Sequence, residues 1–95
     1  MDEQILAGAR SAIDRIDERL TALLVERMKQ VDVIANWKKD HGLPVNVPER
    51  EEIIVQRVRE FAGRDYAGAV ENVFRTLFAV SCNREAELIR EKENK

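Results

Sequence analysis

The chain has 95 residues, of which 44% are hydrophobic, 36% are charged and only 5% are aromatic. Four glycines and two prolines provide little turn chemistry, so the composition predicts one all-α domain and excludes a β-sandwich or barrel. A net charge of −2 provides no basic surface for nucleic acid, and no apolar run is long enough to span a membrane.

We expect no signal peptide at the start of the chain. Residues Met1 to Gln4 are acidic and are not followed by the apolar run of a signal peptide. The lone Cys82 excludes a disulfide framework, and we expect it, like Trp37, to be a packing residue. We therefore expect a soluble cytoplasmic protein.

A long helix is predicted from about Glu3 to about Asp40, because apolar residues recur every three to four positions and no proline interrupts them. At about 1.5 Å per residue this helix would extend about 50 Å, whereas a compact domain of this length is about 30 Å across. The helix cannot bury its apolar seam against the rest of one chain. We expect a second subunit to cover the excess.

Two cations interrupt the seam of this helix. Its two rows are Leu6, Ile13, Leu20, Arg27 and Ile34, and Asp17, Leu24, Val31 and Lys38. A charge removed from water costs several kcal/mol unless a partner compensates it, so an anionic ligand is predicted near Arg27 and Lys38. These two residues point within about 20° of each other, about 16 Å apart along the axis. Arg10 points about 100° away from Arg27 and would reach such a site only from a second copy of the chain.

Two further helices are predicted after a short connection. The first begins at Pro48, which suits an initial helical position, and ends near Ala62 before a Gly-Arg-Asp break. The second runs from about Tyr66 to about Arg90, and the polar residues 91–95 are expected to fray. The predicted fold is therefore three helices per chain in an intertwined helical homodimer.

These two helices also carry polar residues on sides or ends that we expect to be buried. Arg50 and Glu51 begin the first of them, while Ser81 and Glu85 lie four residues apart on one face of the second. Each has an ordinary explanation as a surface charge or a helix contact, but together they predict a pocket rich in cations. One histidine and one cysteine are too few for a metal cluster or Cys–His catalysis. Such a pocket suits a reaction catalysed by holding a polyanion in a reactive shape.

The ordered pattern resembles the all-helical chorismate mutases over nearly the whole chain. The segments that carry the resemblance are Ala9–Arg10, Ile13–Leu20, Leu23–Arg27, Lys38 and Pro48–Glu51. The resemblance implies a homodimer with two active sites, each borrowing an arginine from the neighbouring chain. It also implies the Claisen rearrangement of chorismate to prephenate, in phenylalanine and tyrosine biosynthesis, without a cofactor.

The resemblance implies a substrate-binding role for eight residues, namely Arg10, Arg27, Lys38, Val47, Arg50, Glu51, Ser81 and Glu85. Arg10 of the partner subunit and Arg27 would hold the two substrate carboxylates, with Arg50 supporting the carboxylate end and Ser81 beside a carboxylate. Arg27 is also counted among the catalytic residues, because its grip selects the reactive conformer.

The remaining four residues would act at the ether oxygen and the ring hydroxyl. Lys38 and Glu85 would face the ether oxygen from opposite sides, and Glu51 would accept the hydroxyl hydrogen. Many family members carry glutamine where this chain has Glu85, so this carboxyl should work only when protonated, and turnover should fall as the pH rises. Some relatives have aspartate in place of Val47, which leaves only a backbone amide there.

Two alternatives remain open at this point. Isochorismate pyruvate-lyases share the fold and the basic framework, although Glu51 and Ser81 suit a mutase better. A non-catalytic helical dimer that binds an aromatic-pathway metabolite or enzyme would retain the same fold. The sequence also leaves open whether the chain is free-standing or part of a fusion with another aromatic-pathway enzyme.

Overall fold

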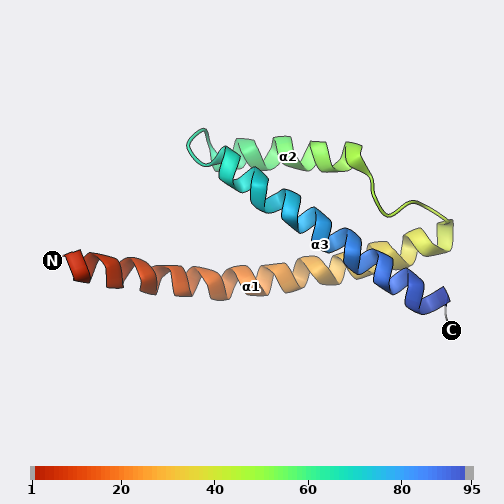
Figure 1. Cartoon of the computed structure of the whole chain (residues 1–95), viewed down its shortest axis with the longest axis horizontal. Helices are drawn as coiled ribbons and strands as arrows, with labels where there is room; N and C mark the ends of the chain where they lie inside the picture. Colours follow the sequence, from red (N-terminus) through yellow and green to blue (C-terminus); the bar gives the residue numbers. More distant parts are fainter. Residues whose placement is uncertain (1, 94–95) are drawn as a thin grey trace. The chain divides into compact units, whose positions relative to one another are not determined.

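The computed structural model describes residues 2–93, which form three α-helices and no β-strand (Figure 1). Helix α1 covers Asp2–His41, α2 covers Pro48–Ala62 and α3 covers Ala67–Glu93. The all-α class with three helices is confirmed, and the predicted bounds of α2 agree with the structure. Helix α3 continues three residues past its predicted end, and the rest of the predicted frayed tail, residues 94 and 95, lies outside the described part.

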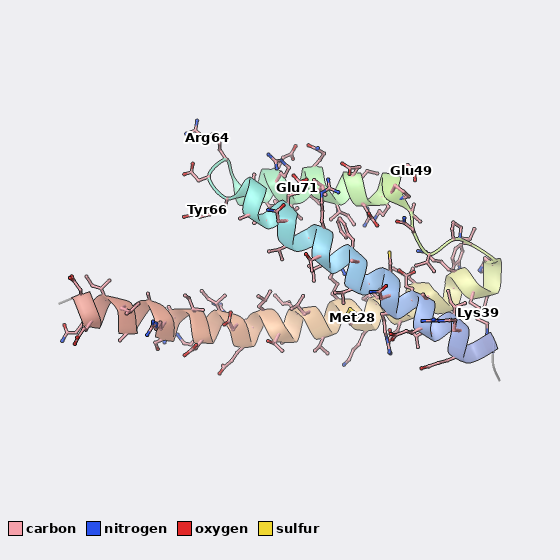
Figure 2. All side chains as sticks on the ribbon, in the orientation of Figure 1. Met28, Lys39, Glu49, Arg64, Tyr66 and Glu71 are labelled. Atoms are coloured by element: carbon pink, nitrogen blue, oxygen red, sulfur yellow. The ribbon has the colours of Figure 1, made fainter. Side chains whose placement is uncertain are left out.

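By its internal contacts the chain divides into two units, residues 1–30 and residues 31–95. The described part of the first unit, residues 2–30, is helical throughout and contains no buried residue. Side chains radiate from α1 in this unit (Figure 2). Seven large apolar ones are about half or more exposed, namely Ile5, Leu6, Ile13, Ile16, Leu20, Leu23 and Val25. A single helix has no second surface on which to pack, so this seam stays accessible.

The second unit contains the end of α1 together with α2 and α3. Helices α2 and α3 run in opposite directions, joined by a turn at Gly63, whose φ of 81° is accessible to glycine at little cost. The buried apolar residues of this unit are Val31, Ala35, Val55, Ala67 and Phe78. They form the core of the unit.

A charged network joins α2 to α3 outside this core. Glu71 lies on α3 on the side near α2 (Figure 2) and accepts hydrogen bonds from Arg59 at 2.6 Å and from Arg75 at 2.8 Å. Arg75 also donates to Glu52 of α2 at 3.1 Å. The hydrogen bonds from Arg75 and then from Arg59 lower the pKa of Glu71. Helices α2 and α3 are therefore joined by ion pairs between charged side chains.

Helix α1 ends in a glycine turn. Gly42 has a φ of 64°, and the amide of Leu43 donates to the carbonyl of Lys38 at 2.9 Å. Trp37 is 55% exposed and stacks on His41 with ring centroids 3.9 Å apart. Trp37 was predicted to be a packing residue, and within the chain its ring packs on the His41 ring in the last turn of α1 while it stays largely exposed.

Candidate active site

Two helix faces of the second unit carry residues protected from solvent at helical spacing. They are Val31, Ala35 and Lys38 on α1, and Phe78, Ser81 and Glu85 on α3. Polar groups thus occupy one end of each face, while the apolar residues occupy the other end. The two polar ends are joined by a direct contact between Lys38 and Glu85.

The Lys38 ammonium lies 2.9 Å from Oε1 of Glu85, and the two side chains are only 14% and 8% exposed. The same ammonium donates a hydrogen bond to the carbonyl oxygen of Val45 at 2.7 Å. Within residues 2–93, no donor makes a hydrogen bond of good geometry to Oε1 of Glu85. The Lys38–Glu85 contact is therefore an ion pair, and the same ammonium also holds the loop through the carbonyl of Val45.

Helix α2 brings a second carboxylate toward this pair. Burial raises the pKa of the Cys82 thiol, and the negative charges of Glu51 and Glu85 raise it further, while the positive charge of Lys38 opposes them. These charges act on the thiol only because they lie near it. Cys82 was expected only to pack, and its position beside Ser81 was the sequence signal that it borders the site.

The other predicted residues of the second unit lie around this cluster. Ser81 is buried and its hydroxyl donates to the carbonyl of Leu77, one turn earlier in α3, at 2.8 Å. Val47 is half-buried, and its carbonyl accepts hydrogen bonds from the amides of Arg50 and Glu51 at the start of α2. The Arg50 residue is exposed. The structure thus brings Lys38, Glu51, Ser81 and Glu85 to one region.

Arg10 and Arg27 belong to the first unit, so their approach to this cluster stays a prediction. Arg10 is exposed, whereas Arg27 is half-buried. A depression along α1 is lined by Leu23, Glu26, Arg27, Lys29 and Gln30.

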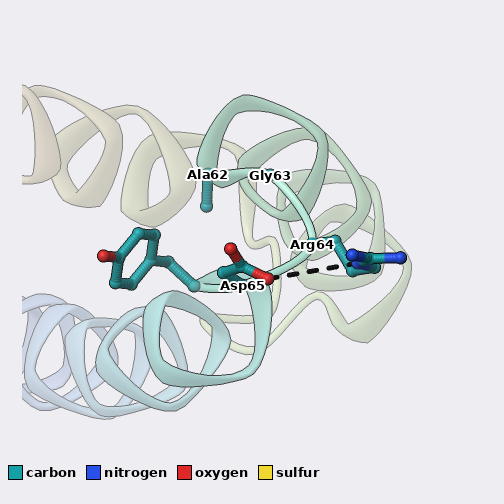
Figure 3. Close-up of a pocket in the computed structure, with 5 residues that line it drawn as sticks. Ala62, Gly63, Arg64 and Asp65 are labelled. Atoms are coloured by element: carbon teal, nitrogen blue, oxygen red, sulfur yellow. Dashed lines mark ion pairs between the residues drawn. The ribbon is translucent and has the colours of Figure 1, made fainter.

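A second depression lies at the turn between α2 and α3 (Figure 3). It is lined by Ala62, Gly63, Arg64, Asp65 and Tyr66. Arg64 and Asp65 lie 4.0 Å apart and are almost fully exposed, so their charges are screened by water. None of the predicted site residues lies there. Residues 2–93 contain no cluster of three potential metal ligands, and none of their helices is long and apolar enough to cross a membrane.

Comparison with known protein families decides the classification of the chain. The model of the family described as chorismate mutase type II matches residues 9–86. The chain belongs to this family. The match extends over every predicted site residue from Arg10 to Glu85, so the resemblance to chorismate mutases is confirmed.

Curated proteins similar to the chain include single and fused chorismate mutases. A chorismate mutase of Methanocaldococcus jannaschii is 40% identical over 58% of this chain and 56% of its own length. A bifunctional chorismate mutase/prephenate dehydratase of Aquifex aeolicus is 32% identical over 87% of this chain, and a T-protein of Haemophilus influenzae is 37% identical over 76%. The matches cover only 24% and 20% of these two relatives. No solved structure gave a significant match.

Proposed function

We propose that this protein is a chorismate mutase, which converts chorismate to prephenate in phenylalanine and tyrosine biosynthesis. The observation that carries the proposal is the protected Lys38–Glu85 pair, with Ser81 on the same face of α3 and Glu51 nearby, inside the family match. The rearrangement breaks one C–O bond and forms one C–C bond within a single molecule. It needs no nucleophile, so positioning and charge stabilisation are sufficient.

Lys38 is the group we assign to the ether oxygen, which gains negative charge as its bond breaks. An ammonium has three donors, and Lys38 directs one to Val45 while it lies beside Glu85. This leaves a donor that can turn toward the substrate. Glu85, when protonated, would donate to the same oxygen from the other side, so both interactions strengthen in the transition state.

The remaining residues select the reactive conformer of the substrate. Arg27 and Arg10 of the partner subunit would hold the two carboxylates through bidentate hydrogen bonds. Arg50 and Ser81 would support the carboxylate end. At the other end, Glu51 would accept a hydrogen bond from the ring hydroxyl, and the backbone amide at Val47 would replace the side-chain contact that some relatives have.

We assign the active form to a homodimer in which residues 1–95 of each copy form a single chorismate mutase domain. The exposed apolar seam of residues 2–30 supports this assignment, because large contiguous apolar surfaces of soluble proteins are usually interaction sites. Arg10 is exposed on the same helix and is free to serve a neighbouring chain's site only if two copies of α1 cross. The site would then be incomplete in a monomer.

We place the protein in the cytoplasm, where its thiol remains reduced, and propose that it works near other enzymes of the same pathway. The Aquifex aeolicus relative, which combines a chorismate mutase with a prephenate dehydratase, supports this association. Assays with and without a dehydratase, dehydrogenase or synthase of the pathway would test it. A rise in turnover on adding one of them is expected.

The test of the activity is to follow chorismate consumption by the purified protein and to identify the product. Prephenate is expected, and Lys38→Met should reduce kcat/KM at least a hundredfold, since it removes a donor to the ether oxygen. Arg64→Met, which changes an exposed cation at the α2–α3 turn, serves as the control. A parallel incubation with isochorismate addresses the lyase alternative: pyruvate release without prephenate formation contradicts the proposal. Absence of turnover together with retained metabolite binding favours a non-catalytic module.

A further inference from the structure

Arg84 of α3 and Asp32 of α1 form a doubly hydrogen-bonded pair. Nε of Arg84 donates to Oδ1 of Asp32 at 2.8 Å, and an Nη atom donates to Oδ2 at 3.0 Å. The hydrogen bond from Arg84 lowers the pKa of Asp32, and the same contact raises the pKa of Arg84. The side chains are 40% and 35% exposed, so this pair lies at the edge of the contact between the two helices.

The position of the pair relates it to the candidate site. Arg84 directly precedes Glu85, and at about 100° per residue it lies about 60° around α3 from Ser81. Asp32 lies about 60° around α1 from Ala35, the middle residue of the other buried face. The pair therefore flanks both faces. Two hydrogen bonds between one guanidinium and one carboxylate restrict rotation as well as distance, which a single point contact does not do.

The buried contact beside it lacks this restraint. Oε1 of Glu85 lies at ion-pair distance from Lys38 without a hydrogen bond of good geometry from any described residue. The contact between Glu85 and Lys38 by itself therefore sets a distance between two groups and does not fix the rotation of α3 about its axis.

We propose that Arg84, through its paired hydrogen bonds to Asp32, is a positioning residue that fixes the rotation of α3 so that Glu85 faces Lys38. This inference rests on the proposed mutase function for its kinetic consequence. Arg84 touches neither the substrate nor the reacting atoms in this role. It acts on the transition state because displacing a donor by about 1 Å is enough to lose much of its contribution.

Kinetics of Arg84→Met and Arg84→Lys test the proposal. The expected result for Arg84→Met is a kcat about tenfold lower with KM changed less than about twofold. Arg84→Lys keeps the charge but loses the paired geometry, so it should resemble Arg84→Met. Arg75→Met is the matched control, because Arg75 is 44% exposed and also joins two helices, but away from Lys38; its kcat should stay within about twofold. A rise in KM at unchanged kcat, or equal losses in Arg84→Met and Arg75→Met, overturns the proposal.

A double-mutant cycle separates positioning from a general loss of stability. If Arg84 acts through Glu85, Arg84→Met should have little further effect on kcat once Glu85 is alanine. The same tenfold loss in both backgrounds contradicts the proposal. Exchanging the charges, with Asp32→Arg and Arg84→Asp together, should recover at least half of the kcat lost in Arg84→Met; failure of the exchanged pair to do so also counts against it.

A measurement without substrate distinguishes this proposal from the proposed function. The nitrogen NMR signal of the Lys38 ammonium should persist in Arg75→Met and broaden or shift in Arg84→Met. If the wild-type protein fails to convert chorismate, the proposed function is wrong, but this signal still tests the positioning role. A Lys38 signal that is identical in the wild type and in Arg84→Met overturns that role.

Discussion

The Glu85 carboxyl is buried beside Lys38 at the point where the proposed chemistry needs a hydrogen-bond donor. An ionised carboxylate would repel the negative charge that develops on the ether oxygen, whereas a protonated one donates to it. We therefore expect kcat/KM to fall as the pH rises. In Glu85→Gln the amide donates at every pH, so the same profile should be flat across this range.

The control for this experiment is Glu87→Gln, an exposed carboxyl two residues farther along α3. At about 100° per residue it points about 160° away from Glu85, so its substitution should leave the pH profile as in the wild type. Rates are measured with chorismate between pH 5 and pH 9. If Glu85→Gln retains the alkaline fall, the role assigned to Glu85 is wrong.

Only part of the site was predictable from residues and their spacing. Ser81 and Glu85 were placed on one face because they are four residues apart, and the burial of both agrees with that prediction. The Arg84–Asp32 pair joins residues 52 positions apart, and no local pattern indicates such a contact. The direct contact between Lys38 and Glu85 was likewise not predicted. The resemblance placed the two side chains on opposite sides of the substrate's ether oxygen.

Helix α2 was predictable at both ends, since Pro48 suits a first helical position and Gly63 supplies a positive φ. The end of α3 was missed because polarity was interpreted as fraying, although Glu and Lys have good helix propensity. The network around Glu71 was missed for another reason. Its bonds to α2 depend on how α2 and α3 pack, and that packing is not encoded in the spacing within either helix.

The α2–α3 network gives the hairpin a testable dependence on pH. The pKa of Glu71 is lowered in the folded protein by Arg75 and Arg59, so its contribution is present above its unfolded pKa and is lost as the pH falls through the folded value. Asp32 contributes with the same sign through Arg84. Glu71→Gln should therefore lower the urea concentration at the unfolding midpoint at pH 7. Between pH 7 and pH 3 this midpoint should then decrease less in Glu71→Gln than in the wild type.

Circular dichroism during urea titration measures this effect, with Asp65→Asn as the control. Asp65 lies in the α2–α3 turn and is 82% exposed, with a distant partner at 4.0 Å. Its substitution should leave the pH dependence of the unfolding midpoint unchanged. Parallel pH curves for Glu71→Gln and the wild type would show that the network contributes nothing through ionisation.

The length of α1 is the basis of the proposed dimer. Forty residues of helix extend about 60 Å, and the described residues before Val31 include none that is buried. Leu20 lies near the middle of the exposed seam at 49% exposure. We expect Leu20→Lys to convert a dimer into a monomer, because a lysine in an apolar dimer contact leaves an unpaired charge out of water.

Sedimentation equilibrium on both proteins, with chorismate turnover measured on the same samples, checks this prediction. Ala22→Lys introduces the same charge on an exposed residue about 160° around the helix from Leu20, so it should remain dimeric and active. Turnover in Leu20→Lys should fall together with the dimer fraction, because each site would lose Arg10 of the partner subunit. A monomeric wild type, or a fully active Leu20→Lys monomer, would show that one chain holds a complete site and that the seam serves another contact.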